Sequence, residues 1–176
     1  TGVRRVLFRS RVNIDALGRI PGEKAGWGAL ADHPERTHVS GVMVLRLDAP
    51  LFWANCETTH MHILEAVDTD EAVRALVLDL EATGQMDTTT ATMLSDLLTE
   101  LRRRDVELFI ARLHYPARVV LEKAGFTDAL GPGHVWHSIS QTVKAAALFI
   151  EGKPLPEVDD AVAWDLESGP QDPGTG

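Results

Sequence analysis

The residues best placed to do chemistry lie in the stretch LDLEATGQMDTTTAT, residues 78 to 92, where an aspartate and three threonines follow a strand-like run. Thr88 offers a hydroxyl that could accept a phosphoryl group, and the N–H groups at the start of a helix could bind that phosphate or another anion. The alternative is that Asp87 caps the helix, its carboxylate accepting from the N–H of Thr89 or Thr90. Capping is the simpler interpretation because it needs no partner, and both stay open.

Two pairs of histidines raise the question of a metal site. His60 and His62 are two positions apart, a spacing that does not face one way on a helix. His134 and His137 have no cysteine or carboxylate at ligand spacing. No metal site is therefore predicted.

The other motifs of catalysis and cofactor binding are missing from the sequence. No nucleophile elbow, P-loop or dinucleotide fingerprint occurs, so we predict neither an enzyme nor a cofactor. Cys56 is the single cysteine and cannot form an internal disulfide, which fits a reducing cytoplasmic setting. We expect Cys56 to pack as a small hydrophobic residue.

Strand-like segments lie on both sides of the threonine loop. The run at 74–80 is almost continuously apolar, which is typical of a strand buried on both faces. The segment 42–49 alternates and is rich in branched residues. Strands or short extended pieces are predicted at 42–49, 51–55, 74–80, 106–111 and 134–138.

Helices are predicted between these strands. The one after the loop has leucines at i, i+3, i+4 and i+7 and ends in three arginines, which suit the negative end of a helix dipole. Helices are also expected at 56–67, at 116–124 before Gly125, and from a cap at Ser138 to about 150. The alternation predicts an α/β fold, a mixed and mainly parallel sheet flanked by about four helices.

Composition describes one ordinary domain with tails. At 176 residues the chain can bury a core, and 44% hydrophobic with 24% charged residues is usual for soluble globular proteins. A net charge of −9 argues against nucleic acid as a partner, because neutralising phosphates supplies most of that affinity. No apolar run is long enough to cross a bilayer, and no signal peptide is visible.

The predicted boundaries divide the chain into three parts. Residues 1–38 are expected to be a leader and linker, partly disordered, and 39–151 the folded domain. Residues 152–176, acidic and rich in proline and glycine, are expected to be a disordered tail. Four arginines within the first 11 residues could lie beside an anionic membrane surface, or the first ten residues could be foreign sequence.

Three stretches carry a family resemblance: GVMVLRLDAPLFWANCE, RALVLDLEATGQMDTTTATMLSDLLTELRRRDVELFIARL and VVLEKAGFTDALGPGHVWHSISQTVKAA. They resemble the STAS domain of SulP-type (sulfate permease) anion transporters, a domain shared with the anti-sigma-factor antagonists of bacteria. RLDAPLFWAN is the piece most specific to the transporter branch. ALGRIPG, at 16–22, resembles the segment that joins the last membrane helix to the STAS domain.

The resemblance implies a STAS fold and a non-catalytic regulatory or interaction domain at the cytoplasmic face of the plasma membrane. The full protein would move sulfate, bicarbonate or another anion. The implied partners are the membrane domain of the same transporter, a second copy in a homodimer, or a cytosolic protein. Nucleotide binding is the weakest expectation, because no phosphate cradle is visible.

The resemblance also implies an alternative function, a free-standing phosphorylatable signalling module. In anti-sigma-factor antagonists the loop reads like Asp-Ser-Ser-Gly, and the first serine is phosphorylated. Thr88 falls on that serine and Thr89 on the next residue, whereas Thr90 replaces the glycine. A β-branched residue there narrows the approach of a partner's backbone, which favours the transporter interpretation.

Overall fold

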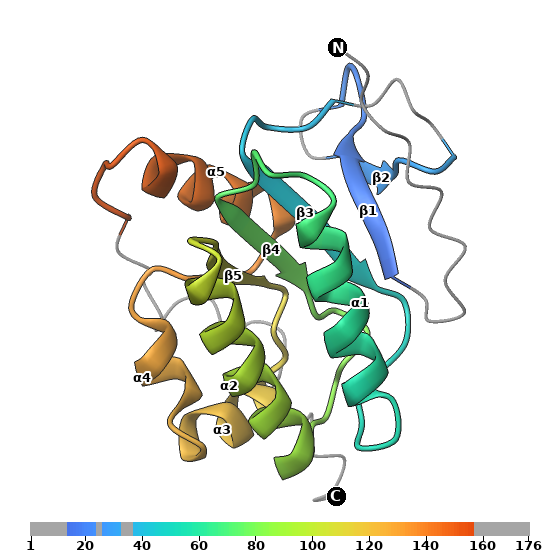
Figure 1. The fold of residues 1–176 in the computed structure, drawn as a ribbon, viewed down its shortest axis with the longest axis vertical. Coiled ribbons are helices and arrows are strands. Elements are labelled where there is room, and N and C mark those ends of the chain that lie inside the picture. The colour runs from blue at the N-terminus through green and yellow to red at the C-terminus, as the bar shows by residue number, and fades with distance from the viewer. Residues whose placement is uncertain (1–13, 24–25, 33–36, 157–176) are drawn as a thin grey trace, which may run out of the picture.

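The computed structural model describes residues 14–23, 26–32 and 37–156. Within them, six strands form one sheet in the order β2-β1-β3-β4-β5-β6, drawn in Figure 1. The strands are β1 (Ile14–Arg19), β2 (Trp27–Ala29), β3 (Val42–Leu47), β4 (Ala75–Asp79), β5 (Glu107–Ala111) and β6 (Val135–Trp136). The first two strands pair antiparallel and the last four run parallel, which confirms the predicted mixed, mainly parallel sheet.

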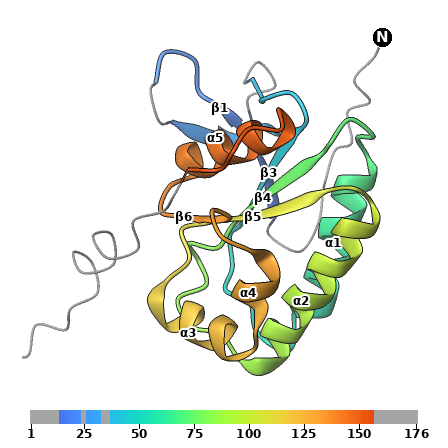
Figure 2. The same cartoon turned by 90° about the vertical axis from the view of Figure 1, so that its left-hand side faces the viewer.

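Five helices connect and cover the strands in the described part of the chain. They are α1 (Cys56–Asp68), α2 (Thr88–Arg103), α3 (Tyr115–Lys123), α4 (Phe126–Leu130) and α5 (Ile139–Ile150). Figure 2 shows α5 alone on one face of the sheet and the other four helices on the opposite face. The fold therefore has three layers, with the sheet in the middle.

The alternation of side chains along the strands builds a separate core on each face. In β4, Leu76 and Leu78 pack with α1 to α4, whereas Ala75 and Val77 pack with α5. All five residues of β4 are buried, as its continuous apolar run predicted. Within the described residues, helices thus cover both faces of the sheet.

The helix boundaries follow from local sequence. The leucines of α2 are buried on one side, and Arg102 and Arg103 occupy its last turn, as predicted. Ser138 caps α5, its hydroxyl oxygen accepting from the N–H of Gln141 at 3.2 Å. Gly125 ends α3 with a φ of 74°, a conformation that glycine adopts without strain.

The structure differs from the predicted linker over residues 1–38. Its β1 pairs with β3, and Leu17 is buried in the core beneath α5, so this segment belongs to the domain. The short β2 extends the sheet by one more strand. The predicted leader at 1–13 and most of the predicted tail, 157–176, lie outside the described residues.

Two further predictions need correction. Residues 51–55 were expected to be extended but form a turn, because the Asn55 side chain accepts from the N–H of Phe52 and donates to the carbonyl of Pro50. The short α4 was not expected, and it raises the number of helices from about four to five. It has only five residues, too few for a helical period to show in the sequence.

Candidate functional site

The threonine loop follows β4 and leads into α2. Asp87 is the N-cap of α2, with an extended backbone, and its Oδ1 accepts from the Thr90 N–H at 2.7 Å. The capping interpretation of Asp87 is therefore confirmed. In Figure 1 the first turns of α1 and α2 lie at the same end of the molecule, beyond the carboxyl ends of the parallel strands.

The second oxygen of Asp87 joins this loop to another one. Its Oδ2 accepts from the backbone N–H of Trp53, in the turn after β3, at 2.9 Å. A second link runs from the Leu51 N–H to the hydroxyl of Thr83, which is fully buried, at 3.1 Å. The turn and the threonine loop are thus fastened together at both ends, although more than 30 residues separate them.

These hydrogen bonds keep Asp87 ionised. The N–H of Thr90, the largest contributor, lowers the pKa of the Asp87 carboxyl, and the N–H groups of Trp53 and Thr89 lower it further. The carboxylate thus occupies the positive end of α2, where an anion would otherwise bind. Any phosphate or free anion at this position must compete with Asp87.

The three threonines differ in their exposure. Thr88 and Thr89 are exposed, so their hydroxyls are accessible to a modifying enzyme. Thr90 is fully buried, on the inner side of α2. Of the residues predicted for a regulatory loop, Asp87, Thr88 and Thr89 therefore lie at the surface, and Thr90 belongs to the packing beneath them.

An ion pair that the sequence analysis did not predict lies at the carboxyl end of β4. Asp79 is fully buried, and its Oδ1 accepts from Nε of Arg112 at 2.9 Å while its Oδ2 pairs with Nη2. Arg112 also contacts Glu81 at 2.6 Å through Nη1. The hydrogen bond to Asp79 is the largest cause of the raised pKa of Arg112, so the cation is held firmly.

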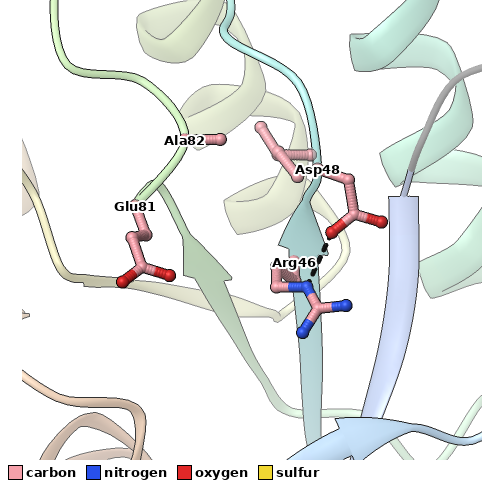
Figure 3. A pocket seen from close by; sticks show the side chains of 5 residues that line it. Arg46, Asp48, Glu81 and Ala82 are labelled. Atoms are coloured by element: carbon pink, nitrogen blue, oxygen red, sulfur yellow. Dashed lines mark hydrogen bonds and ion pairs between the residues drawn. The ribbon is translucent and has the colours of Figure 1, made fainter.

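A second arginine lies at the end of β3. Arg46 pairs with Asp15 at 3.0 Å and with Asp48 at 2.7 Å. Burial and the neighbouring Asp48 raise the pKa of Asp15. A cavity of about 310 Å³ opens here (Figure 3), and the residues that line it are Arg46, Leu47, Asp48, Glu81 and Ala82.

Sequence reasoning missed both arginine clusters because their members are far apart along the chain. Asp79 and Arg112 are separated by 33 positions and Arg46 and Asp15 by 31. The signal available was a charged residue at the end of each buried strand run. Since the carboxyl ends of parallel strands meet at one edge, such residues are expected to lie close together.

His134 and Cys56 are both packed inside the domain. His134 is buried, with its ring stacked 4.5 Å from Phe109 and Nε2 3.2 Å from the Glu107 carboxylate. Cys56 is buried and donates weakly to the carbonyl of Trp53, as expected of a packed cysteine. Among residues 14–23, 26–32 and 37–156, no group of three or more possible ligands is arranged to hold a metal.

No helix in the part of the chain that the structure describes is long and apolar enough to cross a membrane.

Comparison with known proteins gives one matching family model, the STAS domain, over residues 33–146. A probable sulfate transporter of Mycobacterium tuberculosis is 35% identical over 130 residues, which cover 73% of this chain and 23% of that protein. This chain therefore spans about a quarter of the length of the curated relatives it matches.

Solved structures share the fold. The murine Solute Carrier 26 family member A9 anion transporter matches with a TM-score of 0.69 at 18% identity, over 77% of this chain and 22% of that one. The STAS domain of a SulP transporter from Vibrio cholerae matches with a TM-score of 0.56 at 25% identity, over 70% of this chain and 94% of that one. A putative anti-sigma factor antagonist of Thermotoga maritima matches with a TM-score of 0.52 at 12% identity, over 63% of this chain and 92% of that one.

Proposed function

This chain belongs to the STAS domain family, as its sequence predicted, and we propose that it is the cytoplasmic regulatory domain of a SulP-type anion transporter. The observation that carries the proposal is the relative from Mycobacterium tuberculosis, a probable sulfate transporter similar to this chain over 130 residues. Transport itself would take place in a membrane unit, and this domain would contribute contacts rather than chemistry.

The regulatory contacts are proposed to involve the loop at 86–90 and α2. A domain can shift a transporter between conformations only if it contacts the two conformations differently. The exposed Thr88 and Thr89 and the turn that Asp87 holds beside them form a surface suited to such contacts. The membrane domain of the same transporter is the proposed partner, while a second copy and a cytosolic protein are further candidates.

The complete open reading frame provides the first test. We expect it to encode, before this domain, about ten or more apolar segments of roughly 20 residues, the length that a bilayer demands. A reading frame without such segments would contradict the proposal. The second test is uptake of labelled sulfate and bicarbonate by the full-length protein, with and without Thr88→Glu.

Thr88→Glu adds a charge beside Asp87, whereas Thr90→Gly restores the residue typical of anti-sigma-factor antagonists. If both variants transport and self-associate like the parent protein, the loop has no regulatory role. Glu23→Gln is a suitable control, because it changes one charge at an exposed position outside the loop.

The second candidate function is the phosphorylatable signalling module, and the exposed hydroxyl of Thr88 favours it. A phosphate there would be attracted by the positive end of α2 and repelled by Asp87, which already accepts from Thr90. Mass spectrometry of the protein purified from its native cells tests this function. Phosphate on Thr88 would support it, and an unmodified Thr88 under all growth conditions would not.

A further inference from the structure

The turn after β3 presents two aromatic side chains to solvent. We call residues 50–55 the aromatic turn: Trp53 is 71% exposed and Phe52 is 46% exposed. The turn is rigid, because Asn55 closes it from within and Asp87 and Thr83 hold it to the next loop. Its conformation is therefore fixed before any partner arrives.

Trp53 is the most exposed large hydrophobic residue in the described part of the chain. Phe109 and Phe126, by contrast, are fully buried in the core. Tryptophan is enriched among the residues that contribute most to protein interfaces, and a rigid surface loses little conformational entropy on binding. The aromatic turn thus has the properties of a docking surface.

The charge around the aromatic turn restricts the kind of partner. Outside the core, the segments 48–57 and 79–90 contain four acidic residues and no lysine or arginine: Asp48, Glu57, Glu81 and Asp87. The nearby arginines, Arg46 and Arg112, each already contact two carboxylates. Among the described residues this surface is acidic on balance, which favours a basic partner.

This charge excludes two other occupants. An anionic lipid surface would be repelled, because membranes attract basic segments. A second copy bound through the same patch would face acid with acid, since a two-fold interface places identical patches against each other. A basic protein segment would be attracted by the acidic surface and not repelled.

The chain topology shows where such a segment would come from. Because β1 is antiparallel to β3, Ile14 pairs with Leu47 and Asp15 with Arg46, so β1 begins at the carboxyl end of β3. Figure 3 shows β1 starting beside Asp48. A membrane unit that precedes this domain would be attached at the same edge as the aromatic turn.

We propose that the aromatic turn docks onto a lysine- or arginine-bearing cytosolic segment of the membrane unit in the same polypeptide. The inference rests on the proposed function. Cytoplasmic loops next to membrane helices carry an excess of lysine and arginine, which complements the four surface carboxylates. The ring of Trp53 adds a face to which such a cation binds.

Photo-cross-linking in the full-length protein tests this docking. A benzoylphenylalanine is introduced at position 53, and the cross-linked peptide is identified by mass spectrometry. The matched control has the same probe at position 149, since Phe149 is 40% exposed but lies next to Val106, at the opposite edge of the sheet. We expect position 53 to cross-link at least several-fold more strongly, to a basic segment that borders a membrane helix.

Every other result would overturn the docking: equal yields at positions 53 and 149, cross-links to lipid, to a second copy's aromatic turn or to a separate cytosolic protein, or no product. The same probe at position 52 repeats the test if position 53 does not tolerate it. The cross-link from position 53 should also weaken as salt is raised, because the complementary charges are screened. A reading frame without membrane segments would refute the proposed function itself, whereas wrong cross-links in a protein that has them refute only this inference.

Discussion

At the scale of single residues, Asp87 shows how one side chain serves both the fold and the surface. One carboxylate oxygen caps α2 through Thr90, and the other fixes the turn that bears Trp53. A change at Asp87 therefore alters the helix start and the exposed aromatic turn together. Asparagine can keep one of these hydrogen bonds, while alanine loses both.

Replacing the cap should destabilise the domain. We expect Asp87→Ala to lower the free energy of unfolding by about 1 kcal/mol, because an N-cap acceptor is lost. Urea denaturation at neutral pH measures the difference. Asp96→Ala is the matched control, an exposed acid within the same helix, and it should change stability by less than about 0.5 kcal/mol. Equal effects from the two variants would contradict the capping role.

The pH dependence of stability should report the same carboxylate. The folded-state pKa of Asp87 is lowered below its ordinary value of 3.8, mainly by the Thr90 N–H. The unfolded state then binds the proton more readily, so this contribution is complete above about pH 4 and is lost as the pH falls through the lowered pKa. The stability difference between the parent and Asp87→Asn should shrink below about pH 4. A stability difference that stays constant down to pH 2 would be evidence against a lowered pKa of Asp87.

The buried ion pair at the end of β4 should matter more than any surface pair. Arg112→Ala leaves Asp79 fully buried without its main partner, and we expect a loss of about 3–5 kcal/mol in chemical denaturation. Arg103→Ala is the control, since Arg103 is 69% exposed and pairs with Glu100 at the surface, a contact that contributes about 0–1 kcal/mol. If Arg112→Ala lowered the free energy of unfolding no more than Arg103→Ala does, Arg112 would not be required to stabilise the buried Asp79.

At the scale of elements, the sequence predicted what local patterns determine. The leucine spacing of α2, the apolar run of β4 and the cap at Ser138 are all local, and each appears as expected. Strand β1 was missed because its sequence, IDALGR, has a glycine near its end and charged residues, which weaken a strand pattern. Its place in the sheet depends on pairing with β3, which no local pattern shows.

In the candidate site, too, local sequence patterns predict some features, whereas others depend on contacts between distant segments. The cap at Asp87 was predictable because a short polar residue before a helical period is a local signal. The hydrogen bond from Trp53 and the pair between Asp79 and Arg112 join distant segments, so only the sheet brings them together. The strand-like composition of 51–55 predicts an extended piece, because composition does not show the hydrogen bonds of the Asn55 side chain that close the turn.

The role of β1 can be measured by truncation. A chain that starts at residue 14 should fold, whereas one that starts at residue 39 should lose β1 and β2, leave β3 as an open edge and expose its side of the core. We expect the shorter chain to unfold at lower urea concentration and to aggregate in size-exclusion chromatography. Equal stability of the two chains would restore the predicted domain boundary near residue 39.

At the scale of the whole molecule, the aromatic turn and the threonine loop lie together at the carboxyl ends of the parallel strands, here called the carboxyl edge. The carboxyl edge combines the aromatic turn, the exposed threonines and both arginine clusters. Both faces of the sheet are covered by helices, so neither is open to a partner. This edge is therefore the proposed contact surface for a membrane unit.

A surface kept for a partner should be dispensable for folding, and Trp53 allows this to be tested. We expect Trp53→Ala to change the free energy of unfolding by no more than about 0.5 kcal/mol, because the ring is mostly in solvent and the backbone N–H still donates to Asp87. Phe109→Ala, a fully buried aromatic, should cost about 3–5 kcal/mol in the same denaturation experiment. If Trp53→Ala were as damaging as Phe109→Ala, the ring would be part of the fold and its exposure would need no partner. A neutral Trp53→Ala that lowers anion uptake by the full-length protein would instead show that the ring acts on something outside this domain.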